Sequence, residues 1–237
     1  MRGAWFQTTI LTADLLLSTL SANGQWEVRA MAGAGLSRFN TDMHLAHGRD
    51  ETQAVQHRFS WLLGATATHS ITDKLAISSG LCWSAFNGNN EVWIRGNLTQ
   101  EQQWQLQYLY LPLMVHFHWQ GAHVGAGYQS GIPVAGAITF TDHNAWMGMP
   151  DQRSSTHRLD LLRADAGIVA EAGHDLGKKF SVGLRYYRGL SDIRDHSDGL
   201  MDPLYPEQFV LVVSYGLLPK AKPAKPEVPV PAAPAPQ

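Results

Sequence analysis

The sequence predicts an all-β protein, an eight-stranded antiparallel up-and-down transmembrane β-barrel. Three observations lead to this prediction. Apolar residues alternate with polar or glycine residues over eight stretches, which is the two-residue period of a strand. The connections between these stretches alternate between long and short, as in outer-membrane barrels. Charged residues make up only 16% of the chain, against about 25% in an average soluble protein.

The clearest strand pair lies between residues 162 and 189. In its first strand every second residue is apolar, and the opposite set consists of charged residues and glycines, with one valine. The apolar set is Leu162, Ala164, Ala166, Ile168, Ala170 and Ala172, and the opposite set is Arg163, Asp165, Gly167, Val169, Glu171 and Gly173. Gly177 can supply a turn with positive φ. Taken alone, this pattern suits either a soluble sandwich, with the apolar face in its core, or a membrane barrel, with that face toward lipid.

Composition narrows the alternatives. The chain has no run of about 18 apolar residues, so helical membrane spans are excluded. The net charge of −2 argues against a nucleic-acid partner, for which a basic surplus is usual. The only cysteine, Cys82, cannot form an internal disulfide and says little about the redox compartment.

Residues 1–24 resemble a secretory signal peptide, because Arg2 precedes an apolar stretch and the small residues Ser21 and Ala22 follow it. The β-barrel is predicted over residues 25–218. Its eight strands are expected at about 26–37, 58–68, 75–85, 109–119, 124–132, 162–173, 180–189 and 209–217. Polar loops are expected over 40–57, 87–105, 137–157 and 191–206. Short turns join the remaining strands.

Aromatic residues of the apolar face gather near both strand ends, as rings at the two membrane interfaces do. Those nearest the short turns are Trp26, Trp119, Phe180 and Tyr215. Those nearest the long loops are Phe59, Trp61, Trp83, Tyr186 and Phe209. A soluble sandwich has no reason to sort its aromatic residues in this way. The membrane barrel is therefore the preferred interpretation, and the bacterial outer membrane is the predicted location.

The inward face carries charges of both signs. They are Glu27, Asp165 and Glu171 against Arg29, Arg58, Arg163 and Arg185. The interior of an eight-stranded barrel is only wide enough to be filled by side chains, and an unpaired charge there is costly. These seven residues are therefore expected to form a lumenal charge network that plugs the barrel.

Four segments together resemble the PorT-like outer-membrane β-barrel family of Bacteroidetes. They are YLYLPLMVHF (108–117), GAGYQSG (125–131), ADAGIVAEAGHDLGKKFSVGLRYYRGLSDI (164–193) and FVLVVSYGL (209–217). The resemblance covers most of residues 26–218 and implies the same fold. The family usually has an acid before its Leu/Ile-Pro pair and a base after it, where this chain has Tyr110 and His116, so the inward pairing of that strand is altered. The role of the name-giving member in type IX secretion does not carry over.

Residues 219–237 contain seven prolines and no aromatic residue. Such a Pro/Ala/Lys-rich segment cannot bury a core and is expected to be a disordered, polyproline-like tail. An even number of strands places both termini on the short-turn, periplasmic side. The tail lysines could contact peptidoglycan or an acidic periplasmic protein, and a passive spacer is the simpler alternative.

The predicted function is that of a small non-enzymatic anchor, scaffold or interaction protein, with outer-membrane lipid as its surroundings. A narrow, porin-like solute channel is the alternative, followed by a lipid-modifying barrel enzyme. No spacing of Ser, Asp and His singles out a catalytic triad. The loop histidines and aspartates Asp42, His44, His47, Asp50, His143 and His157 lack a rigid scaffold for a metal. No catalytic residue, metal site or cofactor is predicted.

Overall fold

The computed structural model describes residues 25–41, 51–143, 152–158, 163–193 and 203–217. The predicted signal peptide and the predicted tail lie outside these residues, as do the metal candidates between 42 and 50. Within the described part of the chain, no helix has the length and apolar character of a membrane span.

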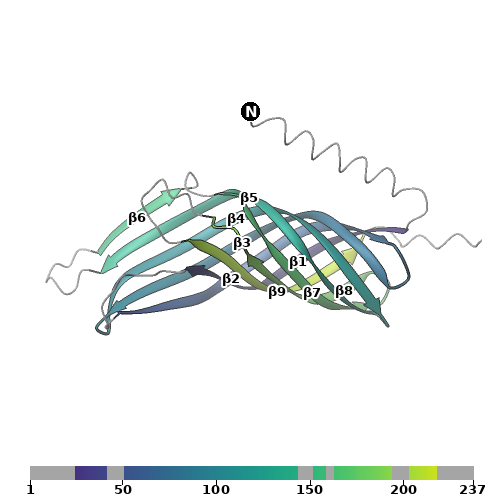
Figure 1. Cartoon of the computed structure of the whole chain (residues 1–237), viewed down its shortest axis with the longest axis horizontal. Coiled ribbons are helices and arrows are strands. Elements are labelled where there is room, and N and C mark those ends of the chain that lie inside the picture. The colour runs from purple at the N-terminus through teal and green to yellow at the C-terminus, as the bar shows by residue number, and fades with distance from the viewer. Residues whose placement is uncertain (1–24, 42–50, 144–151, 159–162, 194–202, 218–237) are drawn as a thin grey trace, which may run out of the picture.

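Strands dominate the described residues, and eight of them close into a ring (Figure 1). The ring strands are β1 (Gln25–Thr41), β2 (Glu51–Ser70), β3 (Leu75–Ile94), β4 (Asn97–Trp119), β5 (Ala122–His143), β7 (Asp165–Leu176), β8 (Phe180–Gly189) and β9 (Leu204–Gly216). Each pairs in antiparallel fashion with its neighbours, and the pairing of β9 with β1 completes the circle. The predicted eight-stranded antiparallel barrel is confirmed.

A ninth strand, β6 (Gln152–Arg158), stands outside the ring. It pairs with the far half of β5, from Ala137 to His143, whereas β7 pairs with the near half, from Ala122 to Gly131. Figure 1 shows β6 beside the far half of β5, which also pairs with β4, where this part of the sheet projects from one end of the barrel. The prediction of a loop over residues 137–157 is therefore wrong for the residues in β5 and β6.

The strands β3 and β4 also run well past their predicted ends. Residues 87–105, predicted to be a loop, are almost all strand, and the chain turns only at Arg95 and Gly96, which have φ angles of 50° and 78°. Positive φ at both central residues suits the right-handed twist of a hairpin. Both faces of this extension carry many amide side chains, so it lacks the apolar alternation by which the other strands were recognised.

The opposite end of the barrel has the expected short turns. Gln120 and Gly121, with φ angles of 50° and 84°, join β4 to β5, and Gly177 lies in the turn between β7 and β8 at a φ of 82°. The two ends of the barrel chain meet here, because the amide of Leu217 donates a hydrogen bond to the carbonyl of Val28. The resulting barrel is therefore asymmetric, with tight turns at one end and long hairpins at the other.

The two faces of each strand differ as the alternation predicted. In β4 the outward Leu113 is 59% exposed, whereas the inward Met114 next to it is 2% exposed. Large apolar side chains cover the outside of all the ring strands, and the buried polar side chains concentrate inside. This arrangement is the inverse of a water-soluble fold and suits a barrel whose outer wall meets lipid.

Candidate functional site in the barrel lumen

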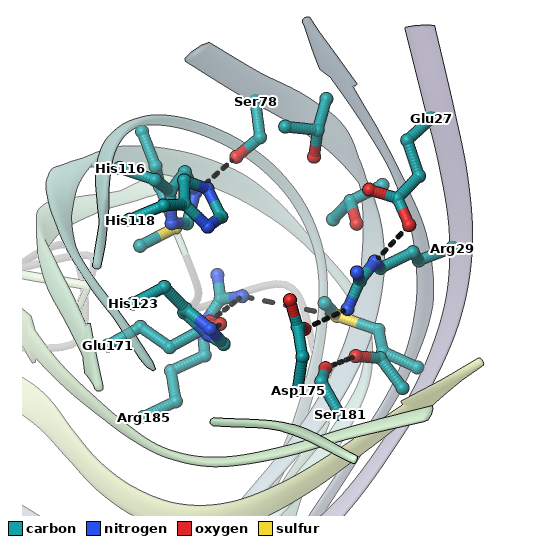
Figure 2. A pocket seen from close by; sticks show the side chains of 15 residues that line it. Glu27, Arg29, Ser78, His116, His118, His123, Glu171, Asp175, Ser181 and Arg185 are labelled. Atoms are coloured by element: carbon teal, nitrogen blue, oxygen red, sulfur yellow. Dashed lines mark hydrogen bonds and ion pairs between the residues drawn. The ribbon is translucent and has the colours of Figure 1, made fainter. Parts of the chain in front are cut away.

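The short-turn half of the lumen contains a small polar pocket. Figure 2 shows fifteen side chains that line it, and they come from all eight strands of the ring. The cavity measures about 50 Å³. A single water needs on the order of 10–15 Å³ by this kind of measure, so the pocket has room for a few waters and not for a solute.

One ion-paired group lies on the β1 side of this pocket. The Nε atom of Arg29 donates to Oε1 of Glu27 at 2.8 Å, and its Nη1 donates to Oδ1 of Asp175 at 3.1 Å. Glu27 and Arg29 were predicted to face inward together. Asp175 was not predicted, because it follows the last regular alternation of its strand and lies close to a turn.

A second group lies across the pocket, where Glu171 and Arg185 are directly opposed on β7 and β8. Nη1 of Arg185 is 3.6 Å from Oε2 of Glu171, and its Nη2 donates to Oε1 of Gln129 at 2.9 Å. Nε2 of His123 is 3.5 Å from Oε1 of Glu171. Arg185 is only 2% exposed. The guanidinium is thus held by a carboxylate and an amide, as a buried charge requires.

Three histidines from the adjacent strands β4 and β5 line one side of the pocket. The ring centroids of His116, His118 and His123 are 5.7–6.3 Å apart, and Nε2 of His116 is 2.7 Å from Oγ of Ser78. Gly125 makes room for the ring of His116, since a Cβ atom there would lie 2.5 Å from Nδ1 of His116. Among the residues that the structure describes, no group of His, Cys, Asp or Glu side chains is arranged to hold a metal ion.

An aromatic layer lies in the lumen beyond this pocket. Asp165, which is 1% exposed, accepts hydrogen bonds from the hydroxyls of Tyr110 at 2.5 Å and Tyr187 at 2.6 Å. Tyr108 stacks on Tyr110 with ring centroids 5.5 Å apart, and Phe86 packs against Tyr187 at 5.9 Å. All four rings are fully buried. Tyr110 therefore donates to a buried carboxylate.

The predicted charge network is only partly present. Four of its seven members, Glu27, Arg29, Glu171 and Arg185, lie in the two ion-paired groups. Asp165 is buried as predicted, but its partners are hydroxyls. The two remaining members, Arg58 and Arg163, are exposed, and their assignment to a buried network is wrong.

Local backbone explains both errors. Strand β2 changes register between His57 and Trp61, so the alternation does not continue through Arg58. Strand β7 begins at Asp165, and Arg163 lies before it, where its backbone amide donates to the carbonyl of Ile193. The apolar–polar pattern from residue 162 therefore began before the strand itself.

The predicted aromatic belts fall into rows of the sheet. At the long-hairpin end, Tyr186, Phe209, Leu36 and Phe59 are consecutive register partners across β8, β9, β1 and β2. At the short-turn end, the rings of Phe180 and Tyr215 are 5.0 Å apart. The remaining predicted members are Trp26, Trp61, Trp83 and Trp119, of which Trp83 and Trp119 are exposed. That these rings contact the lipid interfaces stays a prediction.

One carboxylate with three hydrogen-bond donors, Glu207, lies just past the Phe209 row, outside the predicted membrane span. Glu207 accepts hydrogen bonds from Nε of Arg38 at 2.7 Å, Nδ2 of Asn40 at 2.8 Å and the hydroxyl of Tyr186 at 2.8 Å. Partial burial opposes ionisation of Glu207, but these hydrogen bonds prevail and lower its pKa to about 2.

The fold defines a small outer-membrane β-barrel. A model of the family described as "outer membrane protein beta-barrel domain" matches residues 18–195. The chain belongs to this family, and it is a protein of the bacterial outer membrane.

Solved structures of small outer-membrane proteins resemble the chain at low sequence identity. The attachment invasion locus protein Ail of Yersinia pestis is 11% identical, with a TM-score of 0.42, and the match covers 82% of this chain and 99% of Ail. Neisserial surface protein A is 7% identical, with a TM-score of 0.45 and coverage of 79% and 96%. OprG of Pseudomonas aeruginosa is 13% identical, with a TM-score of 0.39 and coverage of 83% and 96%. No curated protein matches the chain.

Proposed function

We propose that the protein is a closed, non-enzymatic barrel that anchors or scaffolds other components at the outer membrane. In this proposal the long hairpins face the outside of the cell, and the proline-rich segment 219–237 extends into the periplasm. The observation that carries the proposal is the filled lumen, which leaves the outer surfaces and the tail as the parts available for interaction.

Two successive layers support closure. A solute entering from the short-turn end would meet the ion-paired side chains around a cavity of about 50 Å³. Beyond it lie the buried rings of Phe86, Tyr108, Tyr110 and Tyr187. Passage would require separating Arg185 from Glu171 and then breaking the hydrogen bonds of Asp165. Each of these losses would leave a buried charge without its partners, which costs several kcal/mol.

Planar-bilayer recording distinguishes the closed barrel from the alternative, a narrow channel. The full-length protein should give a conductance near zero at both signs of potential. A large, steady conductance in the unmutated protein would refute the proposal and favour the channel.

The contact between Ser78 and His116 is relevant to the alternative of a lipid-modifying enzyme. A serine hydroxyl within hydrogen-bond reach of an imidazole can act as a nucleophile, with the imidazole as its general base. Ser78 is 5% exposed and faces the lumen, however, where the acyl chains of a lipid have no access. Hydrolysis of an acyl ester by the purified protein that is lost in Ser78→Ala would contradict the non-enzymatic proposal.

Orientation can be tested by cysteine labelling of intact cells. The native Cys82 is 1% exposed, so it should give little background. Arg95→Cys, at the tip of the β3–β4 hairpin, should react with a membrane-impermeant maleimide. Lys222→Cys, in the predicted tail, should react only after the outer membrane is permeabilised. The reverse pattern would overturn the proposed orientation.

The finer family assignment and the partner are also part of this proposal. We assign the protein to the PorT-like group on its four sequence segments, without the secretion role of the name-giving member.

The tail would bind peptidoglycan or an acidic periplasmic protein. Affinity purification from the native membrane, with and without residues 219–237, tests this. A partner set that does not change when the tail is removed would contradict a binding role for it.

A further inference from the structure

A polar cleft opens on the outer wall of the barrel where β2 departs from regular pairing. His57 is opposite Gly88 and Trp61 is opposite Ala85, so β2 has one more residue than β3 between these two pairs. This is a β-bulge, which bends the strand and turns side chains to new directions. The cleft beside it has a volume of about 440 Å³, within the range of about 300–1,000 Å³ found for small-molecule sites.

The lining of the cleft combines three kinds of group. Amide side chains come from Asn87 on β3 and from Gln103 and Gln105 on β4. An exposed aromatic ring comes from Phe59, the buried Trp104 forms part of the wall, and the single charged side chain is that of Arg58. Each amide offers both N–H donors and a carbonyl acceptor, and Phe59 is 61% exposed. The backbone of Gly88 completes the lining between β2 and β4.

Part of this surface is preorganised. Nδ2 of Asn87 donates to the carbonyl of Phe59 at 2.7 Å, which ties β3 to the bulge of β2. The backbone of Asn87 is held from the other side, since its N–H donates to Oγ of Ser37 and its carbonyl accepts from the same hydroxyl, each at 2.8 Å. The amide of Gln103 donates to Glu101 at 2.9 Å. These contacts hold Asn87 and Gln103 in place at the cleft.

Two polar groups of the cleft are not used by the fold. In the part of the chain that the structure describes, neither Arg58 nor Gln105 makes a side-chain hydrogen bond or ion pair. Arg58 is therefore a planar cation available to a carboxylate, phosphate or sulfate, which it can bind through two parallel hydrogen bonds.

We propose that this cleft binds an acidic saccharide. The amides suit the many hydroxyls of a sugar, which both donate and accept hydrogen bonds. An exposed aromatic ring suits the C–H face of a sugar ring, since the face of the aromatic ring is negatively polarised and its body is apolar. Arg58 selects for negative charge.

The position of the cleft agrees with this ligand. Phe59 belongs to the row that includes Leu36 and Phe209 on the apolar outer wall, and Arg58 lies next to it at the bulge. The cleft therefore adjoins the edge of the predicted membrane span on the long-hairpin side. In the orientation proposed above, on which this step rests, two sources of acidic sugar are present there. One is the headgroup of an outer-leaflet glycolipid, and the other is a free surface polysaccharide.

Binding can be measured by calorimetry with the full-length protein in phospholipid nanodiscs. An oligogalacturonate serves as the acidic probe, and its fully methyl-esterified form is a neutral ligand of the same size. The acidic form should bind, and the neutral form should bind at least about tenfold more weakly. Equal binding of the two forms, or no binding of the acidic form, would overturn the proposal.

Variants place the binding in the cleft. Arg58→Gln should weaken binding of the acidic probe about tenfold, which corresponds to loss of one charge-assisted contact. Gln105→Ala should weaken it severalfold. Gln107→Ala is the matched control, since Gln107 lies two residues further along β4 and does not line the cleft. Equal effects of Gln105→Ala and Gln107→Ala would exclude the cleft as the site.

A second set of nanodiscs distinguishes the two sources of sugar. If an acidic glycolipid in the same disc competes with the free probe, and Arg58→Gln removes the competition, the headgroup is the ligand. If the glycolipid has no effect while the probe still binds, the free polysaccharide is the ligand. This assay does not depend on conductance. Bilayer recording can therefore refute the closed barrel, and calorimetry can refute saccharide binding, each independently of the other.

Discussion

The lumen satisfies its buried carboxylates in two different ways. In the layer near the short turns, Glu171 lies beside a guanidinium and an imidazole, with Nη1 of Arg185 at 3.6 Å. In the next layer, Asp165 accepts from two tyrosine hydroxyls, and among the described residues no Lys, Arg or His forms an ion pair with it. Opposite charge is thus not the only way to hold a carboxylate inside a barrel, because well-placed neutral donors also replace its lost water.

The two layers differ in what surrounds them. The ionic layer has a cavity with room for a few waters and polar neighbours such as Ser78 and Ser181. The aromatic layer is packed with rings, and an arginine there would have to be desolvated among apolar atoms. Tyrosine fills space with its ring and donates with its hydroxyl. The layers should therefore differ in how much stability is lost when a partner is removed.

The largest effect is expected from Arg185→Met, which removes the cation of the ionic layer. It should lower the free energy of unfolding by about 3–5 kcal/mol, because Glu171 is left buried without its charge partner. Urea unfolding in lipid vesicles measures this. Combining the change with Glu171→Gln should restore part of the stability, as expected for directly coupled residues. A loss below about 1 kcal/mol in Arg185→Met would mean that the ionic layer does not depend on this pair.

The face of each strand opposite the lumen is expected to meet lipid. Ile168 lies on the outer face of β7, between inward residues of the lumen. Ile168→Arg should destabilise the protein by about 2–4 kcal/mol if it lies near the bilayer midplane. The matched control is Ile94→Arg beside the hairpin turn at Arg95, which should cost no more than about 0.5 kcal/mol. Equal costs for the two variants would argue against a lipid-facing outer wall.

A smaller effect is expected in the aromatic layer. Tyr187→Phe keeps the ring and removes one hydroxyl donor from Asp165, so it should cost about 1.5–3 kcal/mol, the usual range for a hydrogen bond to a charged group. Tyr128→Phe is the control, because its side chain is 51% exposed on the outer face and should change stability little. If Tyr187→Phe is as harmless as Tyr128→Phe, the hydroxyl of Tyr187 does not stabilise Asp165.

The smallest effect is expected at Glu207, a carboxylate with a cation partner outside the membrane span. Its pKa of about 2 in the folded protein lies below the ordinary value for glutamate. The contribution of Glu207 to stability is therefore complete above about pH 4.5 and is lost as the pH falls toward 2. For a partly exposed pair, it should amount to about 1 kcal/mol or less.

This prediction is checked by urea midpoints at several pH values. The unmutated protein should lose more stability between pH 4.5 and 2 than Glu207→Gln does, and the two curves should run in parallel above that interval. Identical pH profiles would show that Glu207 does not contribute.

Much of the fold follows from local sequence. The ring of eight strands, the outward position of Ile168 and the inward position of Arg185 follow from two-residue alternation, because successive side chains of any strand point to opposite faces. The same rule failed where the strand was irregular. It assigned Arg58 to the lumen across a bulge, and it extended β7 back to Arg163.

The extended hairpins were missed for a different reason. Alternation is visible only when one face of a strand is apolar, and the β3–β4 extension carries amides such as Asn89 and Gln103 instead. The turn residues Arg95 and Gly96 were the only local signal, and a single X-Gly pair is too common to identify a hairpin by itself. The saccharide cleft lies in this region and was therefore invisible in the sequence.

The sequence by itself determined that this chain forms a lipid-facing barrel and that charges of both signs face inward, because these properties depend only on the spacing of neighbouring residues. Which inward groups meet was decided by the tertiary structure alone. Arg29 meets Asp175 across 146 positions, and Tyr110 meets Asp165 across 55. Such contacts depend on the register of every strand between the two partners and on the closure of β9 against β1. A shift of one residue in any pairing would exchange the partners, and local sequence does not specify the register across the whole ring.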